Sequence, residues 1–543
     1  MTSTSATSGG TKDAPSAIQP HATPHSGSSA RSSINAWGQL WDGLAGISNE
    51  QLARVFYTCL AIHVVAWTIY ASIAHGFGAV HDDMAEAWAW GKEFQLGYYK
   101  HPPFYSWIVG GWFKIFPRDN WSYFLLSALN AALGLAGAWA LAGRFLTGLN
   151  RFAAVLLLTL TPFYNFLAIN FNANSILLSL WPWTVYFFVR SIETGRLTHA
   201  VLLGGFSGFG LLSKYYSALL LVCCFGAALL HPARARYFRS PAPYVAVLVC
   251  GLVVAPHVWW TISNGAPTVQ YAMARAQYST AYVLSKAAQS GVSSMLYHGV
   301  ALGVLFLALR ERALPLLRQA WSRIWQPDHR WIVVLAFGPF ILTLMAGFIG
   351  QMKISSNFTI PIFYLVPVVA LLAAAADMSV ARFQIIAMAS AMVIVAPLLA
   401  SPLVAYLSFA TGRDIASQPR RELVAQAHRV WHEQIGTPVK LVAGTEPYSL
   451  ALAFYSPDEP SELSHFNMDW SPWVVRSRID QEGLLIACVK SDLQCFKQAG
   501  GFATADTRRV GVHAAKTMWG LTLPGTDFEL ILVPPRAIVR AVR

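Results

Sequence analysis

The stretch RVFYTCLAIHVVAWTIYASIA, residues 54–74, decides the fold class, because it stays apolar over the length of a membrane crossing. At 1.5 Å per residue, a helix of about 20 apolar residues covers the roughly 30 Å of hydrocarbon in a bilayer. The chain of 543 residues is 55% hydrophobic and only 12% charged, whereas soluble domains carry about 25% charged residues. The sequence predicts an all-α polytopic membrane protein with eleven crossings, the others near 122–143, 152–169, 175–190, 200–216, 217–230, 242–262, 291–309, 331–349, 358–375 and 383–407.

The basic residues predict the orientation of these crossings. The net charge is +13, and much of the arginine lies in short loops between apolar segments, as the positive-inside rule describes for cytoplasmic loops. This distribution argues against nucleic-acid binding. With the N-terminus inside, the loops at 75–121, 170–174, 263–290 and 350–357 lie outside, opposite the clusters Arg190/Arg196, Arg234/Arg236/Arg239 and Arg310/Arg312/Arg318/Arg323/Arg330.

The two ends of the chain differ from this transmembrane region, 50–410. Residues 1–35 are rich in Ser, Thr, Gly, Pro and Ala, which predicts a disordered cytoplasmic tail. An odd number of crossings leaves residues 412–543 outside. In this part, strand-like runs alternate with polar turns, which predicts a small extracytoplasmic α/β domain. We expect a helix over 418–434 and strands at Val439–Val442, Leu484–Val489 and Phe528–Val533.

Two cysteines of this C-terminal part, Cys488 and Cys495, lie seven residues apart. A disulfide between them is consistent with an oxidising compartment. Two free thiols are an equally good interpretation of the sequence alone.

The outer loop 75–121 holds much of the chemistry-bearing inventory. It contains His81-Asp82-Asp83-Met84-Ala85-Glu86 directly after the first crossing. Asp82 and Asp83 are either solvated helix caps or carboxylates, one of which acts as a general base towards an acceptor hydroxyl. The loop is also aromatic, which is typical either of a membrane-interface belt or of a lining for sugar rings: Trp88, Trp90, Tyr98, Tyr99, Tyr105 and Trp107.

Cations occupy two further places. Lys100 and His101 precede Pro102-Pro103, and tandem prolines stiffen the backbone that carries them. This pair either binds a phosphate or snorkels to lipid headgroups. Lys214 lies within an apolar stretch beside Tyr215, where an ionisable group indicates a functional site or a structural pairing with a carbonyl.

The remaining outer polar residues are less specific. The segment 170–175 is Asn-Phe-Asn-Ala-Asn-Ser, and Asn172 and Asn174 favour capping of the next helix, with binding of hydroxyls as the alternative. Arg275 and Lys353 are candidate partners for an anionic headgroup.

In these residues the chain resembles the GT-C glycosyltransferases that use polyprenyl-phosphate sugars. This group (family 39) includes the protein mannosyltransferases, the lipid A aminoarabinose transferase and the rhizobial galacturonosyltransferases. Its first outer loop carries an Asp-Glu pair and then Gly-Tyr-x-(Asp or Glu)-(His or Lys)-Pro-Pro, which is similar to residues 97–103 here. A Gly-Leu-x-x-Leu-(Ser or Gly)-Lys-Tyr segment is similar to residues 208–215. The resemblance covers about 50–410.

The resemblance implies inverting transfer of a sugar from a polyprenyl-phosphate donor to an envelope glycolipid or polysaccharide. It also implies a bacterial inner membrane, with the site and residues 412–543 on the periplasmic face. Asp83 falls on the catalytic Asp, with Asp82 beside it. Met84 and Lys100 replace acidic residues of the family, so no metal ligands are assigned, and a divalent ion stays open as a cofactor. The lipid phosphate would contact Lys100, His101, Lys214, Arg275 and Lys353, and the sugar or acceptor would contact Glu86, Tyr98, Tyr99, Asn172, Asn174 and Tyr215.

Two other classes of function stay open at the level of sequence. A transporter or flippase for lipid-linked saccharides would use Lys214 and the outer acids for passage. An assembly protein would use residues 412–543 as its active part.

Overall fold

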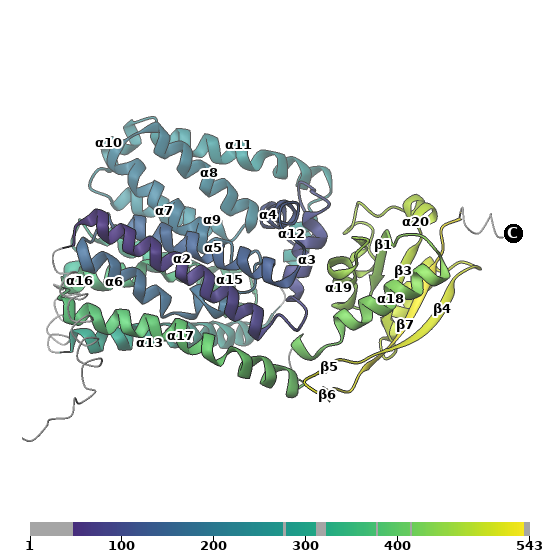
Figure 1. Cartoon of the computed structure of the whole chain (residues 1–543). Helices are drawn as coiled ribbons and strands as arrows, with labels where there is room; N and C mark the ends of the chain where they lie inside the picture. The colour runs from purple at the N-terminus through teal and green to yellow at the C-terminus, as the bar shows by residue number, and fades with distance from the viewer. Residues whose placement is uncertain (1–46, 275–277, 311–321, 376–377, 413–414, 537–543) are drawn as a thin grey trace, which may run out of the picture. The chain divides into compact units, whose positions relative to one another are not determined.

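The computed structural model describes residues 47–274, 278–310, 322–375, 378–412 and 415–536. The predicted tail 1–35 and the candidate Arg275 therefore lie outside the described residues. Helices account for the structure up to Ala410, and a small mixed sheet with its own helices follows (Figure 1). The described residues from Ser48 onward belong to one compact unit.

Within the described residues, six helices are long and apolar enough to cross a membrane. Their hydropathy explains why they are stable as helices, since a bilayer requires every backbone N–H and C=O to be bonded within the segment. They are α2 (Asn49–Ala74), α5 (Asn120–Ala142), α11 (Ala242–Ser263), α13 (Thr280–Leu309), α15 (Arg330–Ile349) and α17 (Val380–Ala410).

A seventh predicted crossing, 152–169, is broken. Helix α6 (Gly148–Thr159) ends before Pro162, and the chain bends by 76° into Pro162–Ala168. Proline has no N–H to continue the helix. The Asn165 amide donates to the Thr159 and Thr161 carbonyls over 2.7 and 3.0 Å, so the break leaves these two backbone oxygens satisfied.

The other four predicted segments are helical, but shorter or more polar. They are α7 (Leu177–Thr194), α8 (Leu197–Ser213), α9 (Ser217–Leu230) and the pair η4–α16 (Phe363–Ala374). All eleven predicted segments thus contain helix, and the number that crosses the membrane stays a prediction. Lys214 lies in the short turn between α8 and α9.

Neighbouring helices pack in the order α2, α5, α7, α8 and α11 (Figure 1). Helices α8 and α11 approach closely at Gly204, where an added Cβ would lie 2.4 Å from the Ala246 carbonyl oxygen. Small residues at such crossings are the usual means of packing helices in a membrane. The short helices α10 (Arg234–Arg239) and α12 (Pro267–Ala274) precede and follow α11.

The outer loop folds into two short helices, α3 (Asp82–Gly91) and α4 (Phe104–Trp112). Its aromatic residues form a core of their own: Trp90, Tyr98 and Tyr105 are at most 1% exposed. The Trp90 and Tyr98 rings stack with centroids 5.1 Å apart, and the Tyr98 hydroxyl donates to the Trp90 carbonyl. These three rings therefore hold the loop together and do not form a lipid-facing belt.

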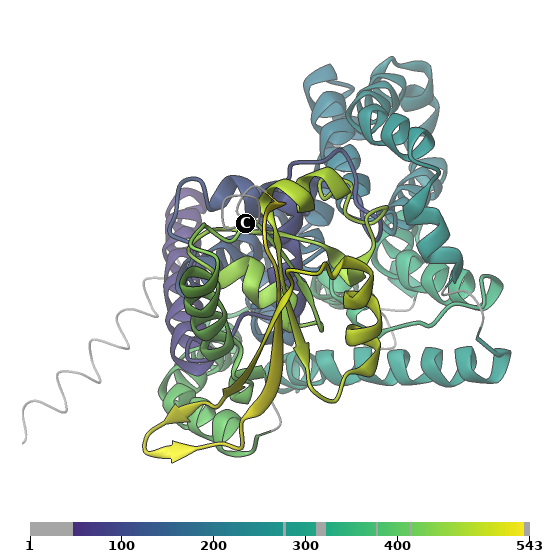
Figure 2. The same cartoon turned by 90° about the vertical axis from the view of Figure 1, so that its right-hand side faces the viewer.

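A five-stranded sheet in the order β2-β1-β3-β7-β4 organises the C-terminal region. Strand β1 pairs in parallel with β2 and β3, and β7 pairs antiparallel with β3 and β4. The strands are β1 (Leu441–Gly444), β2 (Ser461–Glu462), β3 (Leu484–Val489), β4 (Arg508–Ala514) and β7 (Thr526–Val533), and β5 (Thr517–Met518) and β6 (Leu521–Thr522) form a hairpin between β4 and β7 (Figure 2).

Four helices accompany this sheet: α18 (Arg420–Gln434), α19 (Tyr448–Tyr455), α20 (Arg476–Glu482) and α21 (Leu493–Ala499). Helix α18 packs against α19 and β4. The predicted helix over 418–434 is therefore confirmed, as are the predicted strands at 484–489 and 528–533. The first predicted strand is shifted by two residues, to β1.

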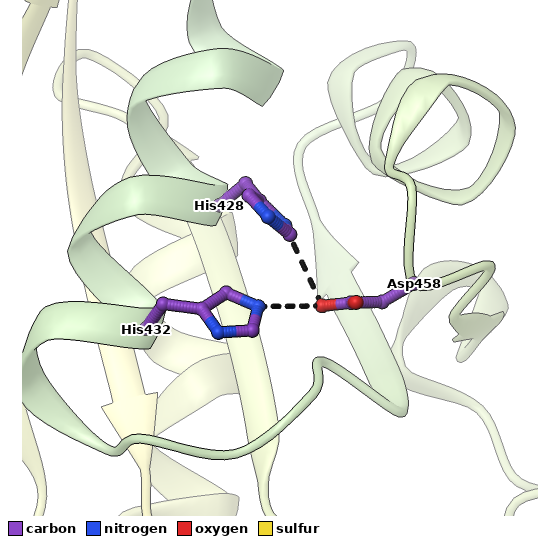
Figure 3. Close-up of side chains that lie close together, drawn as sticks. All are labelled: His428, His432 and Asp458. Carbon is purple, nitrogen blue, oxygen red and sulfur yellow. Dashed lines mark hydrogen bonds and ion pairs between the residues drawn. The ribbon is translucent and has the colours of Figure 1, made fainter.

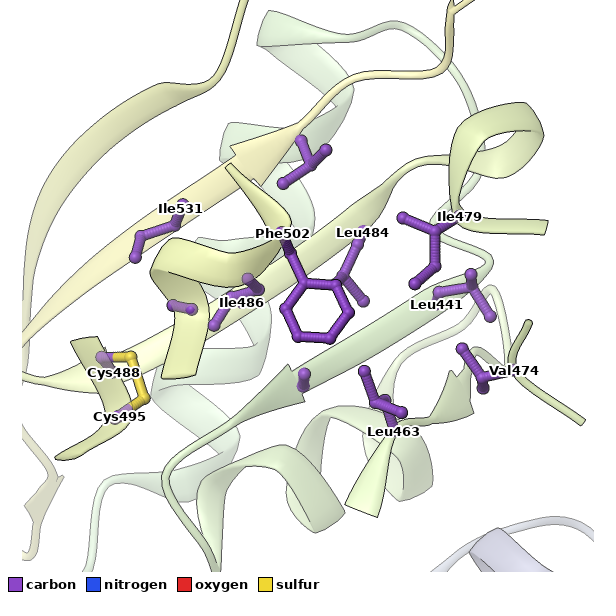
Figure 4. Packing of buried hydrophobic residues seen from close by; sticks show 13 residues of the cluster. Leu441, Leu463, Val474, Ile479, Leu484, Ile486, Cys488, Cys495, Phe502 and Ile531 are labelled. Atoms are coloured by element: carbon purple, nitrogen blue, oxygen red, sulfur yellow. A yellow bond between two sulfur atoms is a disulfide. The ribbon is translucent and has the colours of Figure 1, made fainter. Parts of the chain in front are cut away.

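Buried side chains from β1, β3 and β7 form the core of this region with Phe502 and Val474 (Figure 4). Cys488 on β3 and Cys495 on α21 are joined by a disulfide within this core, with Cα atoms 5.7 Å apart. Of the two sequence interpretations, the structure therefore selects the disulfide, which ties α21 to the sheet.

Glu462 on β2 is fully buried beside the core. The hydroxyls of Ser449 and Ser464 donate to its two oxygens over 2.9 and 2.6 Å. Burial raises the pKa of Glu462 from 4.5 to about 7, the nearby Glu446 adding to the rise and the hydroxyl donors opposing it.

Because this folded-state pKa is raised, the C-terminal region loses stability as pH rises through about 7, relative to a variant without the carboxyl group. We expect the unfolding free energy of Glu462→Gln, minus that of wild type, to grow by about 3 kcal/mol between about pH 4.5 and pH 8. Denaturant unfolding at several pH values measures this difference. The exposed Glu433→Gln serves as control, and an equal pH profile for both variants would contradict the assignment.

Candidate active site

Asp83 lies in the first turn of α3, which His81 caps by accepting from the Asp83 N–H at Nδ1 over 3.2 Å. Its carboxylate accepts a hydrogen bond of 3.2 Å from the Asn172 amide. The side chain remains 41% exposed. The carboxylate is therefore held in position and still open to a substrate.

Asn172 has two tasks. Its amide oxygen accepts from the backbone N–H groups of Asn174 and Ser175 over 2.9 and 3.1 Å, which orders the turn 172–175. The predicted capping of the next helix is wrong, because the N-cap of α7 is Ile176 and no side chain caps this helix. Its amide nitrogen meets Asp83. One side chain thus orders the turn before α7 and orients the carboxylate of α3.

Lys214 extends this set of contacts. Its ammonium donates to the Asn174 amide oxygen and lies 4.3 Å from the centroid of the Phe358 ring. Asp83, Asn172, Asn174 and Lys214 therefore form one polar group from three distant segments. The loops 75–121 and 170–174 were predicted to lie outside, and Lys214 was predicted within an apolar stretch.

Glu86 and Lys100 form a buried ion pair. The Lys100 ammonium donates to both Glu86 oxygens over 3.0 and 3.1 Å, and Glu86 is 6% exposed. Burial raises the pKa of Glu86 to about 8, although the Lys100 charge opposes this and the Asp83 charge adds to it. Burial disfavours the Lys100 ammonium, but Glu86 and then Asp83 offset it and raise the pKa of Lys100.

Glu86 therefore faces Lys100. Contact of Glu86 with the sugar and of Lys100 with the lipid phosphate stay predictions. Lys100 is oriented by Glu86 beside Asp83.

Asp82 points to a different partner. Arg420, the first residue of α18, donates to its carboxylate over 2.5 Å and is only 2% exposed. Asp82 thus anchors the C-terminal region to α3. With Asp82 held by Arg420 and Glu86 by Lys100, Asp83 is the remaining carboxylate of α3. A divalent cation such as Ca²⁺ takes six to eight oxygen ligands, which this set does not supply with two of its carboxylates already paired.

The C-terminal region supplies side chains that sequence reasoning missed. Trp470 stacks on Tyr99 with ring centroids 4.3 Å apart, and His465 lies 3.4 Å from the Glu446 carboxylate. Glu446 is close enough to contribute to the raised pKa values of Glu86 and Tyr99. The sequence carried no signal for these contacts beyond the general aromatic and acidic content of the region.

Tyr215 has a positioning role. Its hydroxyl lies 2.6 Å from His257 Nε2, and the other ring nitrogen of His257 lies 2.7 Å from the Leu96 carbonyl oxygen. At the next residue, an added Cβ on Gly97 would lie 2.2 Å from the Trp260 ring. Close packing against α11 therefore explains why glycine opens the 97–103 motif.

The remaining predicted site residues are His101, Tyr98, Tyr99 and Lys353. His101 is half-buried with its ring 5.9 Å from that of Tyr105. Tyr98 and Tyr99 are both buried. Lys353 is exposed after α15 and, among the described residues, makes no hydrogen bond or ion pair with the polar group.

Comparisons with known proteins match this architecture. Residues 100–260 match a family model described as dolichyl-phosphate-mannose-protein mannosyltransferase. ArnT from Cupriavidus metallidurans, in a crystal structure bound to undecaprenyl phosphate, aligns with a TM-score of 0.56 at 15% identity, over 89% of this chain and 98% of that one. Its apo crystal structure gives the same TM-score at 14% identity, over 90% and 99%. The chain has the GT-C fold.

A curated relative extends the resemblance. The lipid A galacturonosyltransferase RgtD of Rhizobium johnstonii is 23% identical over 262 residues, which cover 46% of this chain and 54% of that protein. The match thus spans about half the length of this relative. The similarity to GT-C glycosyltransferases that the motifs predicted is confirmed.

A double-mutant cycle tests the Glu86–Lys100 pair. Glu86→Gln leaves a buried ammonium without its anionic partner, and we expect a loss of about 3 kcal/mol in unfolding free energy. Lys100→Met should cost a similar amount, and Glu86→Gln combined with Lys100→Met should recover most of it. Denaturant unfolding in detergent measures each value.

The exposed pair Arg54–Glu50 is the matched control. Breaking it should cost less than about 1 kcal/mol. Strictly additive losses at Glu86 and Lys100 would show that the two side chains do not act as a pair.

Proposed function

We propose that this chain is an integral membrane glycosyltransferase that moves a sugar from a polyprenyl-phosphate donor to an envelope glycolipid or polysaccharide. The observation that carries the proposal is the polar group of Asp83, Asn172, Asn174 and Lys214, with Lys100 beside it. It combines one exposed carboxylate with two cations, which is what this transfer requires.

In the proposed reaction Asp83 takes the proton of the acceptor hydroxyl. The acceptor oxygen attacks the anomeric carbon from the face opposite the phosphate and forms the new glycosidic bond. The bond between that carbon and the phosphate oxygen breaks, and the lipid phosphate leaves with both electrons. The configuration at the anomeric carbon is therefore inverted.

The cations act on the leaving group. Negative charge grows on the phosphate oxygen as its bond breaks, and preorganised cations stabilise that charge most strongly in the transition state. Lys214, held by Asn174, and Lys100, held by Glu86, are the two candidates that the structure brings beside Asp83. His101 lies next to Lys100 in the chain.

The relatives support the choice of substrates. The ArnT crystal structure contains undecaprenyl phosphate, and RgtD is described as acting on lipid A. We extend both to this chain as a polyprenyl-phosphate donor and a glycolipid acceptor. The proposed location is the bacterial inner membrane, with the N-terminus inside and the region from α18 onward in the periplasm, where the disulfide Cys488–Cys495 would be stable.

The role of Asp83 is tested by Asp83→Asn. The amide keeps the shape of the side chain but cannot accept the acceptor proton, so we expect transfer to fall by about 10²-fold or more. The assay measures sugar transfer from a synthetic polyprenyl-phosphate sugar in proteoliposomes, together with mass spectrometry of envelope glycolipids from a complemented deletion strain.

The control is Asp119→Asn, a half-exposed carboxylate between α4 and α5 that pairs with Arg421. It should retain transfer. Normal glycolipids in the Asp83→Asn strain would reject the enzymatic proposal. Passage of lipid-linked saccharide across the membrane without transfer would instead favour the flippase.

Lys214→Met tests stabilisation of the leaving group. Removing one preorganised donor at such a site lowers turnover by about 10²- to 10³-fold. We expect the loss mainly in kcat, because the charge that Lys214 meets grows in the transition state. Lys114→Met, an exposed lysine beyond α4, should behave as wild type. An unchanged kcat for Lys214→Met would assign Lys214 a structural role only.

A further inference from the structure

A second cluster of ligating side chains lies in the C-terminal region (Figure 3). His428 and His432 lie one turn apart on α18, and both rings point to Asp458 in the turn after α19. His432 Nε2 and His428 Nδ1 lie 2.8 and 3.4 Å from the same Asp458 oxygen. Among the described residues, this is the one group of three His, Cys, Asp or Glu side chains placed closely enough to share a metal ion.

The geometry is that of a metal site with three protein ligands. The ligand atoms lie within 4.8 Å of one another. Zinc takes His nitrogen and Asp oxygen at about 2.0–2.2 Å in a tetrahedron, so neighbouring ligand atoms are roughly 3.4 Å apart. The His428–Asp458 separation already has this value, and the His432–Asp458 contact needs to open by only a fraction of an ångström.

Two observations distinguish this cluster from an ordinary His–Asp hydrogen bond. His428 Nδ1 is shielded from solvent and, among the described residues, makes no hydrogen bond. The centroids of the two imidazole rings are 4.3 Å apart. Both rings share the single carboxylate of Asp458. A simple pair needs a single histidine, as His513 and Asp527 show on β4 and β7 with a separation of 2.8 Å.

The surroundings fix the carboxylate. The Val439 N–H donates to the Asp458 oxygen over 2.8 Å, which is the kind of outer contact that orients metal ligands. The three side chains are 16–38% exposed, so an ion can enter from solvent and a water molecule can complete the coordination.

We propose that His428, His432 and Asp458 bind one transition-metal ion of the Zn²⁺ class, with water as the fourth ligand. The ion would clamp α18 to the turn 456–460. That turn also contacts the outer loop through Arg118. The Arg118 guanidinium donates to the Ser456 carbonyl over 2.9 Å and lies 3.5 Å from the Glu459 carboxylate. The site is therefore a structural clamp near the contact between the two regions, and it does not depend on the proposed catalytic function.

Metal binding by full-length protein tests this proposal. The protein is purified in detergent without a polyhistidine tag, stripped with a chelator and titrated with Co²⁺ and Zn²⁺ at about pH 7.5. Wild type should gain the visible absorption of tetrahedral Co²⁺ and lose it on addition of one equivalent of Zn²⁺. It should also bind one Zn²⁺ more than His428→Ala or His432→Ala, by elemental analysis.

His513→Ala is the matched control, because it disrupts a His–Asp pair that has no second histidine. It should keep the wild-type Zn²⁺ stoichiometry and the wild-type Co²⁺ absorption. If an alanine variant does not purify, Asp458→Asn carries the same comparison, since it keeps the shape of the side chain but is a much weaker ligand. Equal Zn²⁺ stoichiometry and an equal Co²⁺ spectrum in wild type and variants would overturn the proposal.

Discussion

The buried ion pair between Glu86 and Lys100 is the contact on which the outer loop depends. Removing two charges from water is costly, and only close geometry compensates for that cost. The two hydrogen bonds of 3.0 and 3.1 Å provide it. By joining α3 to the start of the Lys-His-Pro-Pro segment, the pair holds the motif against the helix that carries Asp83. The aromatic core of Trp90, Tyr98 and Tyr105 excludes water beneath it.

From this loop, the site is built by amides rather than by further charges. Asn172 connects Asp83 to the turn before α7, and Asn174 connects that turn to Lys214. A carboxylate and an ammonium in direct contact would neutralise each other. Instead, the Asn172 amide orients Asp83 and the Asn174 amide orients Lys214. Asp83 stays accessible to a substrate.

The transmembrane helices and the catalytic candidates could be predicted because their signals are local. Each of the eleven predicted apolar runs contains helix, and the motif around residues 97–103 identified the loop. The break at Pro162 was missed because hydropathy does not register one absent N–H group. The pairing of Glu86 with Lys100 was missed because the two residues lie 14 positions apart. The contacts of Arg420 and Trp470 join residues more than 300 positions apart, which no local pattern records.

The anchoring of Asp82 by Arg420 has a consequence for biogenesis. Arg420, Glu446 and Trp470 follow the six long apolar helices of the described residues, so the ribosome makes them after those helices. Before they are made, Asp82 lacks its Arg420 partner and Tyr99 lacks the stacked ring of Trp470. The candidate site therefore becomes complete only when the C-terminal region has been delivered and folded. Maturation of the candidate site therefore depends on correct folding of the C-terminal region.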